Sequence, residues 1–330
     1  MTRAAYAIAL MLFPFVASAH HSFAEFDTGD TVEIEGQVVA VNWKNPHVTL
    51  TLRGSDTTWE LEAQDVNSLG RRGLTANLLA VGDRVKVAGY PSRRREHTLF
   101  VTNVLLPTGT EIRTRGETKP RWSTTTIGFD EPNVPDIQAR APRATGIFRV
   151  WMPIEDGALP ADLPLTQAAS AARSAWDPAD NLTLKCIGSG MPAAVVISRY
   201  HPIAFAESDG DIVLSIEVFD AVRTIHMQPS ARSKQPRSAM GYSVGHWEGD
   251  TLVVHTTDVS WPYFDAAGSV PQSEAVEIME RFTVNDKQNE LVYDREVRDP
   301  STFTAPVVQR AVLTWRPDLR VEPFECVANR

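Results

Sequence analysis

The sequence predicts a mainly β protein built from two barrels. Short segments rich in Val, Ile, Thr and aromatic residues recur along most of the chain, separated by Gly, Asp, Asn and Pro, a pattern typical of antiparallel sheets. Between two groups of such segments lies a proline-containing stretch without a long apolar run, residues 107–145, which we interpret as a linker. With 330 residues, 43% of them apolar, the chain is long enough for two domains.

The first 19 residues have the pattern of a secretory signal peptide. Arg3 precedes an apolar run from Ala4 to Val16, and the small residues Ala17-Ser18-Ala19 follow it, as at a cleavage site. The run is too short to span a bilayer comfortably and Pro14 interrupts it, which disfavours an anchor helix. No later stretch is apolar enough for a membrane span. We therefore expect cleavage after Ala19 and a soluble periplasmic or secreted protein.

Residues 20–106 predict a small five-stranded barrel. Three strand-like segments are followed by a helix-like segment at Leu74–Ala80, with Thr75 as its N-cap, and then by two more strand-like segments. This order is that of an OB fold. The predicted strands are Thr31–Trp43, His47–Arg53, Thr57–Ala63, Arg84–Tyr90 and Leu99–Leu106.

The predicted loop between the fourth and fifth strands carries Arg93-Arg94-Arg95. OB folds often bind oligonucleotides through this loop, and the alternative is a solvated hairpin tip. The net charge of -9 and the sequence pI near 5.4 favour the hairpin tip, as does the expected export. We expect no nucleic-acid partner.

Residues 146–330 predict a larger antiparallel barrel similar to a lipocalin, of the kind that can enclose one small ligand. A short helix at Thr166–Trp176 comes first and ends at Asp177-Pro178. The ligand would be a small apolar or aromatic molecule. The strand-like segments are Pro192–Tyr200, Pro202–Glu207, Ile212–Phe219, Val222–Met227, Thr251–Thr257, Ala275–Val284, Glu290–Arg298, Pro306–Trp315 and Arg320–Glu325.

Two charged residues share the apolar faces of predicted strands in this barrel. Alternation along Val276–Val284 places Glu280 on the apolar face, and alternation along Leu291–Val297 does the same for Arg295,. Arg295 is therefore the natural partner of Glu280. A carboxylate inside a barrel must be paired or have its pKa raised. Glu280 is thus either half of a structural ion pair or a general acid or base.

The segment Gly241–Asp250 is the richest in chemical groups and contains Tyr242, His246 and Trp247. Its end, Glu248-Gly249-Asp250, predicts a hairpin turn equally well. The chain has no Ser-His-Asp order and no G-x-S-x-G motif that would identify a nucleophile.

Two functions remain open for the larger barrel. A binding protein would contact its ligand through Arg295, Trp247 and His246. An acid–base enzyme, whether hydrolase, lyase or isomerase, would transfer protons through Glu280 together with Tyr242 or His226.

The expected mature N-terminus is a candidate metal site. Cleavage after Ala19 leaves an α-amine on His20, followed directly by His21. An amine and an imidazole can both be neutral near physiological pH and together chelate one ion, an arrangement that suits copper as Cu(II). His47 is the best third ligand within the same domain, and Glu25 and Asp27 could add oxygen atoms. The alternative is an accidental His-His pair, with His47 capping a turn.

Cys186 and Cys326 are the only two cysteines of the chain. In an oxidising compartment they can form a disulfide, which would tie the C-terminus back to the start of the second domain. Two free thiols are the alternative, because no spacing rule joins them. Neither cysteine has a CxxC neighbour, so redox catalysis and zinc binding are poorly supported.

The motifs His20-His21-Ser22-Phe23 and Asn45-Pro46-His47, with the segment Val81–Gly89, resemble a bacterial family of exported OB-like domains of unknown function over residues 20 to about 106. The C-terminal half resembles uncharacterised lipocalin-like domains, at Arg223–Met227 and in the segments around Gly241 and Glu280. Relatives read Met-Asp-Gly where this chain has Met227-Gln228-Pro229. The resemblance implies export and paired β domains, and it implies no particular activity.

Overall fold

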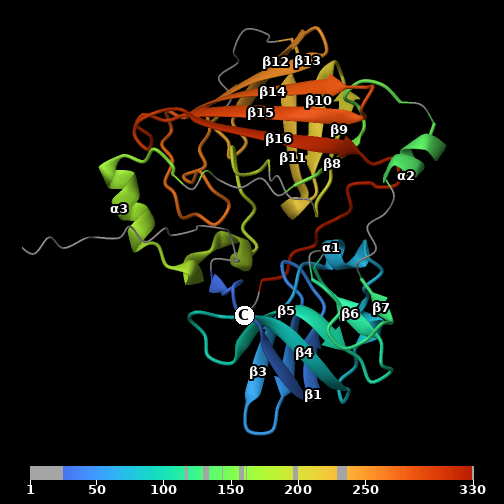
Figure 1. Ribbon diagram of the computed structural model, residues 1–330. Coiled ribbons are helices and arrows are strands. Elements are labelled where there is room, and N and C mark those ends of the chain that lie inside the picture. Colours follow the sequence, from blue (N-terminus) through green and yellow to red (C-terminus); the bar gives the residue numbers. More distant parts are fainter. Residues whose placement is uncertain are drawn as a thin grey trace, which may run out of the picture.

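The computed structural model describes residues 25–115, 118–128, 134–142, 144–155, 160, 162–195, 200–228 and 236–328. Its strands form two closed barrels, one of five and one of nine strands (Figure 1). The predicted mainly β fold with a small and a large barrel is therefore confirmed. No helix among these residues is long and apolar enough to cross a membrane.

The small barrel closes through a parallel contact between its third and fifth strands. Its strands are β1 (Val32–Asn42), β2 (Thr49–Arg53), β3 (Thr58–Glu62), β4 (Arg84–Pro91) and β5 (Thr98–Leu105). β1 pairs antiparallel with β2 and β4, while β3 pairs in parallel with β5. Alternate residues of each strand point inward and form one apolar core, which includes Leu52, Leu61, Val87 and Leu99,.

The helical part of this domain differs from the prediction. α1 (Val66–Gly70) begins after Asp65, whose carboxylate accepts a hydrogen bond from the Ser68 backbone N–H at 2.8 Å. The predicted helix at Leu74–Ala80 is only a short 3-10 turn, and Thr75 makes no side-chain capping bond there. The helix starts where a side chain satisfies its free N–H groups, and the apolar spacing further along does not replace that cap.

Part of the segment expected to be a linker joins the sheet of the small barrel. β6 (Glu111–Arg113) pairs with β5, and β7 (Thr126–Ile127) pairs with β6. The fully buried Glu111 carboxylate organises the intervening loop. It accepts hydrogen bonds from the Asn103 side chain and from the backbone N–H groups of Arg121, Trp122 and Ser123. The short helix α2 (Val134–Arg140) follows.

The larger barrel is an up-and-down barrel with one exception. All its neighbouring strands are antiparallel, except that β11 and β12 pair in parallel. A closed ring with an odd number of strands cannot alternate direction throughout, so the fully antiparallel prediction needed this correction. The strands are β8 (Val150–Pro153), β9 (Ile203–Ser208), β10 (Asp211–Ile216), β11 (Ala221–His226), β12 (Tyr242–Glu248), β13 (Thr251–Thr257), β14 (Glu277–Asn285), β15 (Glu290–Arg298) and β16 (Val307–Trp315).

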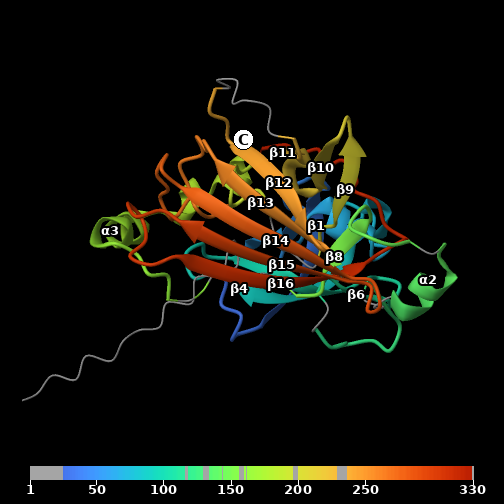
Figure 2. The same ribbon diagram turned by 90° about the horizontal axis from the view of Figure 1, so that it is seen from above.

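Several local predictions for this domain are confirmed and others are wrong. α3 (Gln167–Ala175) begins at the expected N-cap Thr166; α2 and α3 lie at opposite sides of the barrel (Figure 2). β8 was not predicted, and neither was β12. The described part of the predicted strand at 192–200 is a turn rather than a strand, and the predicted strand at 320–325 is irregular.

The interior of the larger barrel is filled by its own side chains. Phe282 contacts Phe205 edge-on with ring centres 5.2 Å apart and stacks on Tyr293 at 4.6 Å. Trp151 is completely buried at the same core. Aromatic side chains bury large apolar areas, so this core holds the barrel together.

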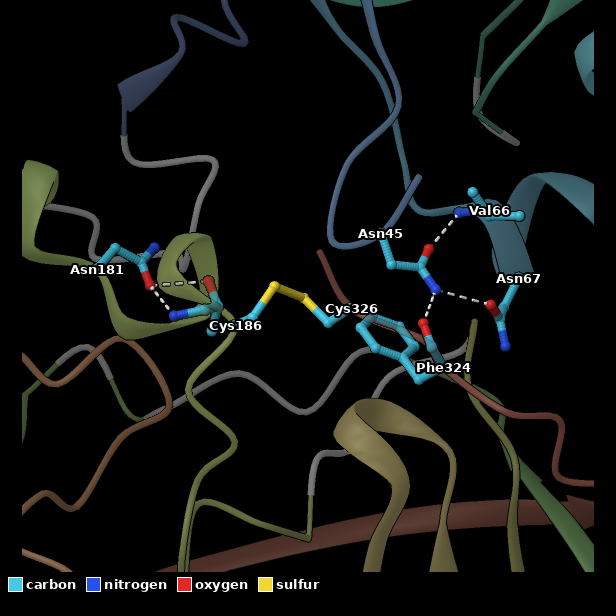
Figure 3. The surroundings of a disulfide bond; sticks show 8 residues. Asn45, Val66, Asn67, Asn181, Cys186, Phe324 and Cys326 are labelled. Atoms are coloured by element: carbon cyan, nitrogen blue, oxygen red, sulfur yellow. Dashed lines mark hydrogen bonds between the residues drawn. A yellow bond between two sulfur atoms is a disulfide. The ribbon is translucent and has the colours of Figure 1, made fainter. Parts of the chain in front are cut away.

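The chain after β16 returns to the small barrel and joins the two domains (Figure 1). Asn45 contacts it: the side-chain amide donates to the Phe324 carbonyl and to Asn67 Oδ1, and its oxygen accepts from the Val66 N–H at 2.8 Å (Figure 3). The predicted disulfide between Cys186 and Cys326 is present beside this contact. It ties the C-terminal segment to the beginning of the second domain.

Loss of this disulfide should lower the free energy of unfolding by about 2–5 kcal/mol, because it closes a loop across a sequence separation of 140,. We expect this shift in urea unfolding curves when Cys186 and Cys326 are both replaced by Ser. Reductant should destabilise the wild-type protein similarly and leave the double variant unchanged. Equal stability of wild type and variant would contradict the prediction.

Candidate functional site

The site residues predicted from the sequence lie in three separate places. Glu280 and Arg295 are inside the larger barrel, whereas Tyr242, His226, His246 and Trp247 are on or near its surface. His47 belongs to the small barrel. His20 and His21 lie outside the described residues.

Glu280 is the centre of a fully buried polar cluster. Its Oε2 atom accepts a hydrogen bond from Arg223 Nη2 at 2.5 Å, and its Oε1 atom accepts one from the Tyr293 hydroxyl at 2.7 Å. Each of the three side chains is at most 1% exposed. Burial raises the pKa of Tyr293, and the Glu280 carboxylate raises it further. Tyr293 therefore remains a protonated donor.

The cluster extends across five consecutive strands. Arg223 on β11 donates through Nε to Ser243 on β12 at 2.9 Å and through Nη2 to Thr256 on β13 at 2.6 Å. Glu280 on β14 and Tyr293 on β15 complete the series. We call these five residues the polar belt. The alternation that predicted Glu280 and Arg295 to face inward also places Arg223 on the same face of β11 as the apolar Ile225,. The inward position of Arg223 could therefore have been predicted from the sequence.

Arg295 is not the partner of Glu280, although the two residues are directly opposite in the β14–β15 register. Arg295 Nη1 donates to the Pro192 carbonyl at 2.6 Å, and Nη2 donates to the Gln309 side chain. Both oxygens of Glu280 are already engaged by the polar belt. The predicted pair is therefore wrong because Arg223 reaches Glu280 from β11, three strands away in the barrel. The hydroxyl groups of Ser243 and Thr256 also accept hydrogen bonds from its N–H groups.

His226 and Tyr242 lie together but away from Glu280. Their rings stack with centres 4.9 Å apart, and His226 Nδ1 is 2.7 Å from the Asp211 carboxylate. His226 is three residues after the inward-facing Arg223 on β11, and Tyr242 is one residue before the inward-facing Ser243 on β12. Because side chains alternate along a strand, His226 and Tyr242 lie on the outer face. The barrel wall separates this pair from Glu280. The structure does not assemble the three residues predicted for acid–base chemistry.

The predicted ligand contacts are not brought together either. Arg295 is 6% exposed, whereas Trp247 is 44% exposed. The exposed His246 lies 3.2 Å from Glu248, a neighbour on its own strand. His246 and Trp247 are consecutive residues of β12, so their side chains lie on opposite faces of that strand and do not form one binding surface,.

His47 belongs to a chain of side-chain contacts on the small barrel. Its Nδ1 atom is 2.6 Å from the Glu62 carboxylate, and the other oxygen of Glu62 is 3.4 Å from Arg95. Arg95 also forms an ion pair with Glu25, to which Ser92 donates at 2.7 Å. This series connects the first described residue of the chain to His47.

Electrostatic attraction links His47 and Glu62, whose nearest atoms are 2.6 Å apart. Burial alone would lower the pKa of His47, but the Glu62 carboxylate outweighs this effect and raises it. Burial would likewise raise the pKa of Glu62, yet His47 and then Arg95 lower it. Nδ1 faces the carboxylate without forming a hydrogen bond of regular geometry. Once Nε2 carries no proton, it is the ring nitrogen that remains for a ligand, as in metal sites whose other histidine nitrogen faces a carboxylate.

The described residues contain no group of three or more His, Cys, Asp or Glu arranged to hold a metal ion. Glu25 and Asp27, which could have added oxygen ligands, are engaged with Arg95 and Arg93. A metal site at His47 would need further ligands from the residues before Glu25.

All three residues of the arginine triplet face carboxylates. Arg93 pairs with Asp27 at 3.0 Å and Arg94 pairs with Asp177 of the second domain at 2.8 Å, while Arg95 pairs with Glu25 and Glu62. The triplet therefore holds neighbouring segments of this chain.

A polar groove of about 400 Å³ lies on another part of the small barrel, where sequence reasoning predicted no site. Within it, Glu33 is bound by Lys86 and Arg121, which lower its pKa to about 2. Besides Glu33 and Arg121, the groove is lined by Thr31, Tyr90, Thr102, Asn103, Thr118, Lys119 and Pro120.

A buried ionic network joins the two domains and was also missed. His201 lies 3.4 Å from Asp65 and 3.1 Å from Glu217; Arg71 of the small domain donates to Glu217 at 2.9 Å and to the Tyr200 carbonyl at 2.5 Å. Burial would lower the pKa of His201, but the two carboxylates raise it to about 9. The charges satisfy one another across the domain boundary, which indicates a structural joint.

This network should make stability depend on pH. His201 has a pKa of about 9 when folded and about 6.5 when unfolded, so its contribution is complete below pH 6.5 and disappears as the pH rises through 9. We expect the wild-type protein to lose roughly 2–4 kcal/mol between pH 6.5 and 9 relative to His201→Gln, measured by urea unfolding. Parallel pH profiles of the two proteins would exclude this role for His201.

The polar belt should tolerate complete replacement better than partial replacement. Glu280→Gln leaves the charge of Arg223 uncompensated in the core and should lower the free energy of unfolding by about 3–5 kcal/mol. The double variant Arg223→Met/Glu280→Leu removes both charges and should recover most of that loss in the same urea assay. A double variant as unstable as Glu280→Gln would contradict this account.

Comparison with known families covers only the N-terminal part of the chain. Residues 9–100 match a family described as "Family of unknown function (DUF6152)", and no curated protein matches the chain. The matched region includes the small barrel up to its fifth strand, together with the Asn45-Pro46-His47 motif. The N-terminal part is thus similar to a family that has no assigned activity.

Proposed function

We propose that the protein is exported and binds a copper-type ion at its mature N-terminus, with His47 as one ligand. The contact between His47 Nδ1 and Glu62, at 2.6 Å, carries this proposal. A carboxylate that holds one ring nitrogen fixes the orientation of the ring and leaves the other nitrogen for a metal. The remaining ligands would be the α-amine and imidazole of His20, with His21 beside them.

The path of the chain supports this ligand set. Glu25 is tied to Arg95 and Ser92, and Arg95 also contacts Glu62, the partner of His47. Glu25 is five positions after His20, and a segment of that length spans up to about 17 Å when extended. That length is sufficient to bridge the two side chains lying between Glu25 and His47.

The disulfide supports export. Cys186 and Cys326 are bonded, and such bonds persist mainly in oxidising compartments such as the periplasm. Export matters for the metal site because an α-amine on His20 exists only after the first 19 residues are removed.

No specific observation favours an apolar-ligand site or acid–base chemistry in the larger barrel. A binding site for an apolar or aromatic molecule would need space in an interior filled by Trp151, Phe205 and Phe282. The acid–base hypothesis would need Glu280 to meet Tyr242 or His226, which lie on the other faces of their strands.

Copper titration of correctly processed protein tests the proposal. Protein recovered from the periplasm should have a mass that begins at His20 and should bind Cu(II) more tightly than a version with one glycine ahead of His20. In the processed protein, His47→Ala should also weaken Cu(II) binding. Glu62→Gln should weaken it by about 10–100-fold relative to the processed wild type.

His246→Ala is the matched control, since His246 is an exposed histidine of the larger barrel, and it should leave the affinity unchanged. Equal, weak Cu(II) binding by the processed and extended proteins would overturn the proposal. Tight binding that His47→Ala leaves intact would retain an N-terminal copper site and remove His47 from it.

A further inference from the structure

Buried polar atoms without hydrogen-bond partners gather around the segment Ser189–Pro192 in the larger domain. Of the residues the structure describes, Ser189 Oγ, Trp261 Nε1, Gln272 Oε1 and Arg295 Nε have none. Three hydrogen bonds link their residues: Arg295 donates to the Pro192 carbonyl at 2.6 Å, and Gln272 donates at 2.9 Å to the carbonyls of Met191 and Trp261. These atoms therefore belong to one neighbourhood.

Donors outnumber acceptors among these free atoms. Trp261 Nε1 and Arg295 Nε can only donate, Gln272 Oε1 can only accept, and the Ser189 hydroxyl can do either. Arg223 Nη1, in the adjoining polar belt, is another buried donor without a partner. A group that accepts several hydrogen bonds would satisfy the donors of this set.

The same region carries an excess positive charge. Arg223 is neutralised by Glu280 at 2.5 Å, but the described contacts of Arg295 are with neutral oxygens of Pro192 and Gln309. The guanidinium lies 6.0 Å from the centre of the Tyr293 ring and is only 6% exposed. A guanidinium cannot lose its proton in a protein, so its charge persists in the interior.

The other buried carboxylates of this domain are committed elsewhere. Asp265 accepts hydrogen bonds from Ser269 and Val270 of its own loop. Asp299 accepts them from Ser273, Ser301 and Thr302. Glu217 belongs to the ionic network at the domain boundary. None of these carboxylates forms an ion pair with Arg295 in the described structure.

We propose that the larger barrel binds one small monovalent anion, of halide or formate size, between Arg295 and the N–H group of Trp261. A buried charge is stable only when it is paired, and an anion would supply both the missing charge and the missing acceptor. Buried water could satisfy the N–H groups but not the charge. The filled core limits the ligand to a small ion. This proposal does not depend on the copper site.

Thermal unfolding of metal-free full-length protein in different sodium salts tests the anion site. Chloride or formate is compared with gluconate, which is too large for a packed interior, at constant sodium concentration and pH. Once the site begins to saturate, the midpoint should rise by about 3–5 °C for each tenfold increase in chloride and stay constant in gluconate. Arg295→Gln should abolish this response, and Trp261→Phe should weaken it.

Arg310→Gln is the matched control, because Arg310 is an exposed arginine on the neighbouring strand, paired with Asp294 at 3.1 Å. It should leave the chloride response intact. Broadening of the bromide NMR signal by the wild-type protein, reversed by chloride, gives a readout that needs no variant to fold. Equal stability in chloride and gluconate without broadening would overturn the proposal in favour of buried water, as would a full response in folded Arg295→Gln.

Discussion

The side chain of Asn45 is the contact on which the arrangement of the molecule depends. Its amide oxygen accepts the first N–H of α1, and its amide N–H groups hold Asn67 and the C-terminal segment at Phe324. One short turn therefore fixes a helix of the small barrel to a strand-less segment that comes from the large one. His47, two residues later, starts the contacts with Glu62, so the joint between the domains and the proposed metal ligand share the same turn.

Burial of charge is the second constraint, and the two domains meet it differently. At the domain boundary, carboxylates and cations alternate through Asp65, His201, Glu217 and Arg71, so the charges are balanced. Inside the larger barrel, Glu280 balances Arg223 but leaves Arg295 with neutral partners. Since an unpaired interior charge is unfavourable, this imbalance indicates that the barrel is complete only with something bound.

The sequence predicted the faces of strands better than their partners. Alternation placed Glu280 and Arg295 inward, because period-2 patterning depends only on the local chain. It could not predict that Arg223 would reach Glu280, since strands three apart in the barrel are related by closure and stagger, which no local pattern records. The ionic network at His201 was missed for the same reason: its members come from both domains and meet only through tertiary contacts.

Errors in the elements also have physical causes. Tyr242–Glu248 was interpreted through its polar groups and its Gly-Asp turn, although Ser243 and Gly245 face the interior and the segment is β12. Thr166 correctly predicted the start of α3 because its hydroxyl caps the helix, and Asp65 would have predicted α1 by the same test. Capping is a property of adjacent residues and can be predicted locally. The proposed metal site is of the opposite kind, because His47 follows an interdomain turn and its proposed partners come from the N-terminus. Only the folded chain brings Glu25, Arg95 and Glu62 together beside it.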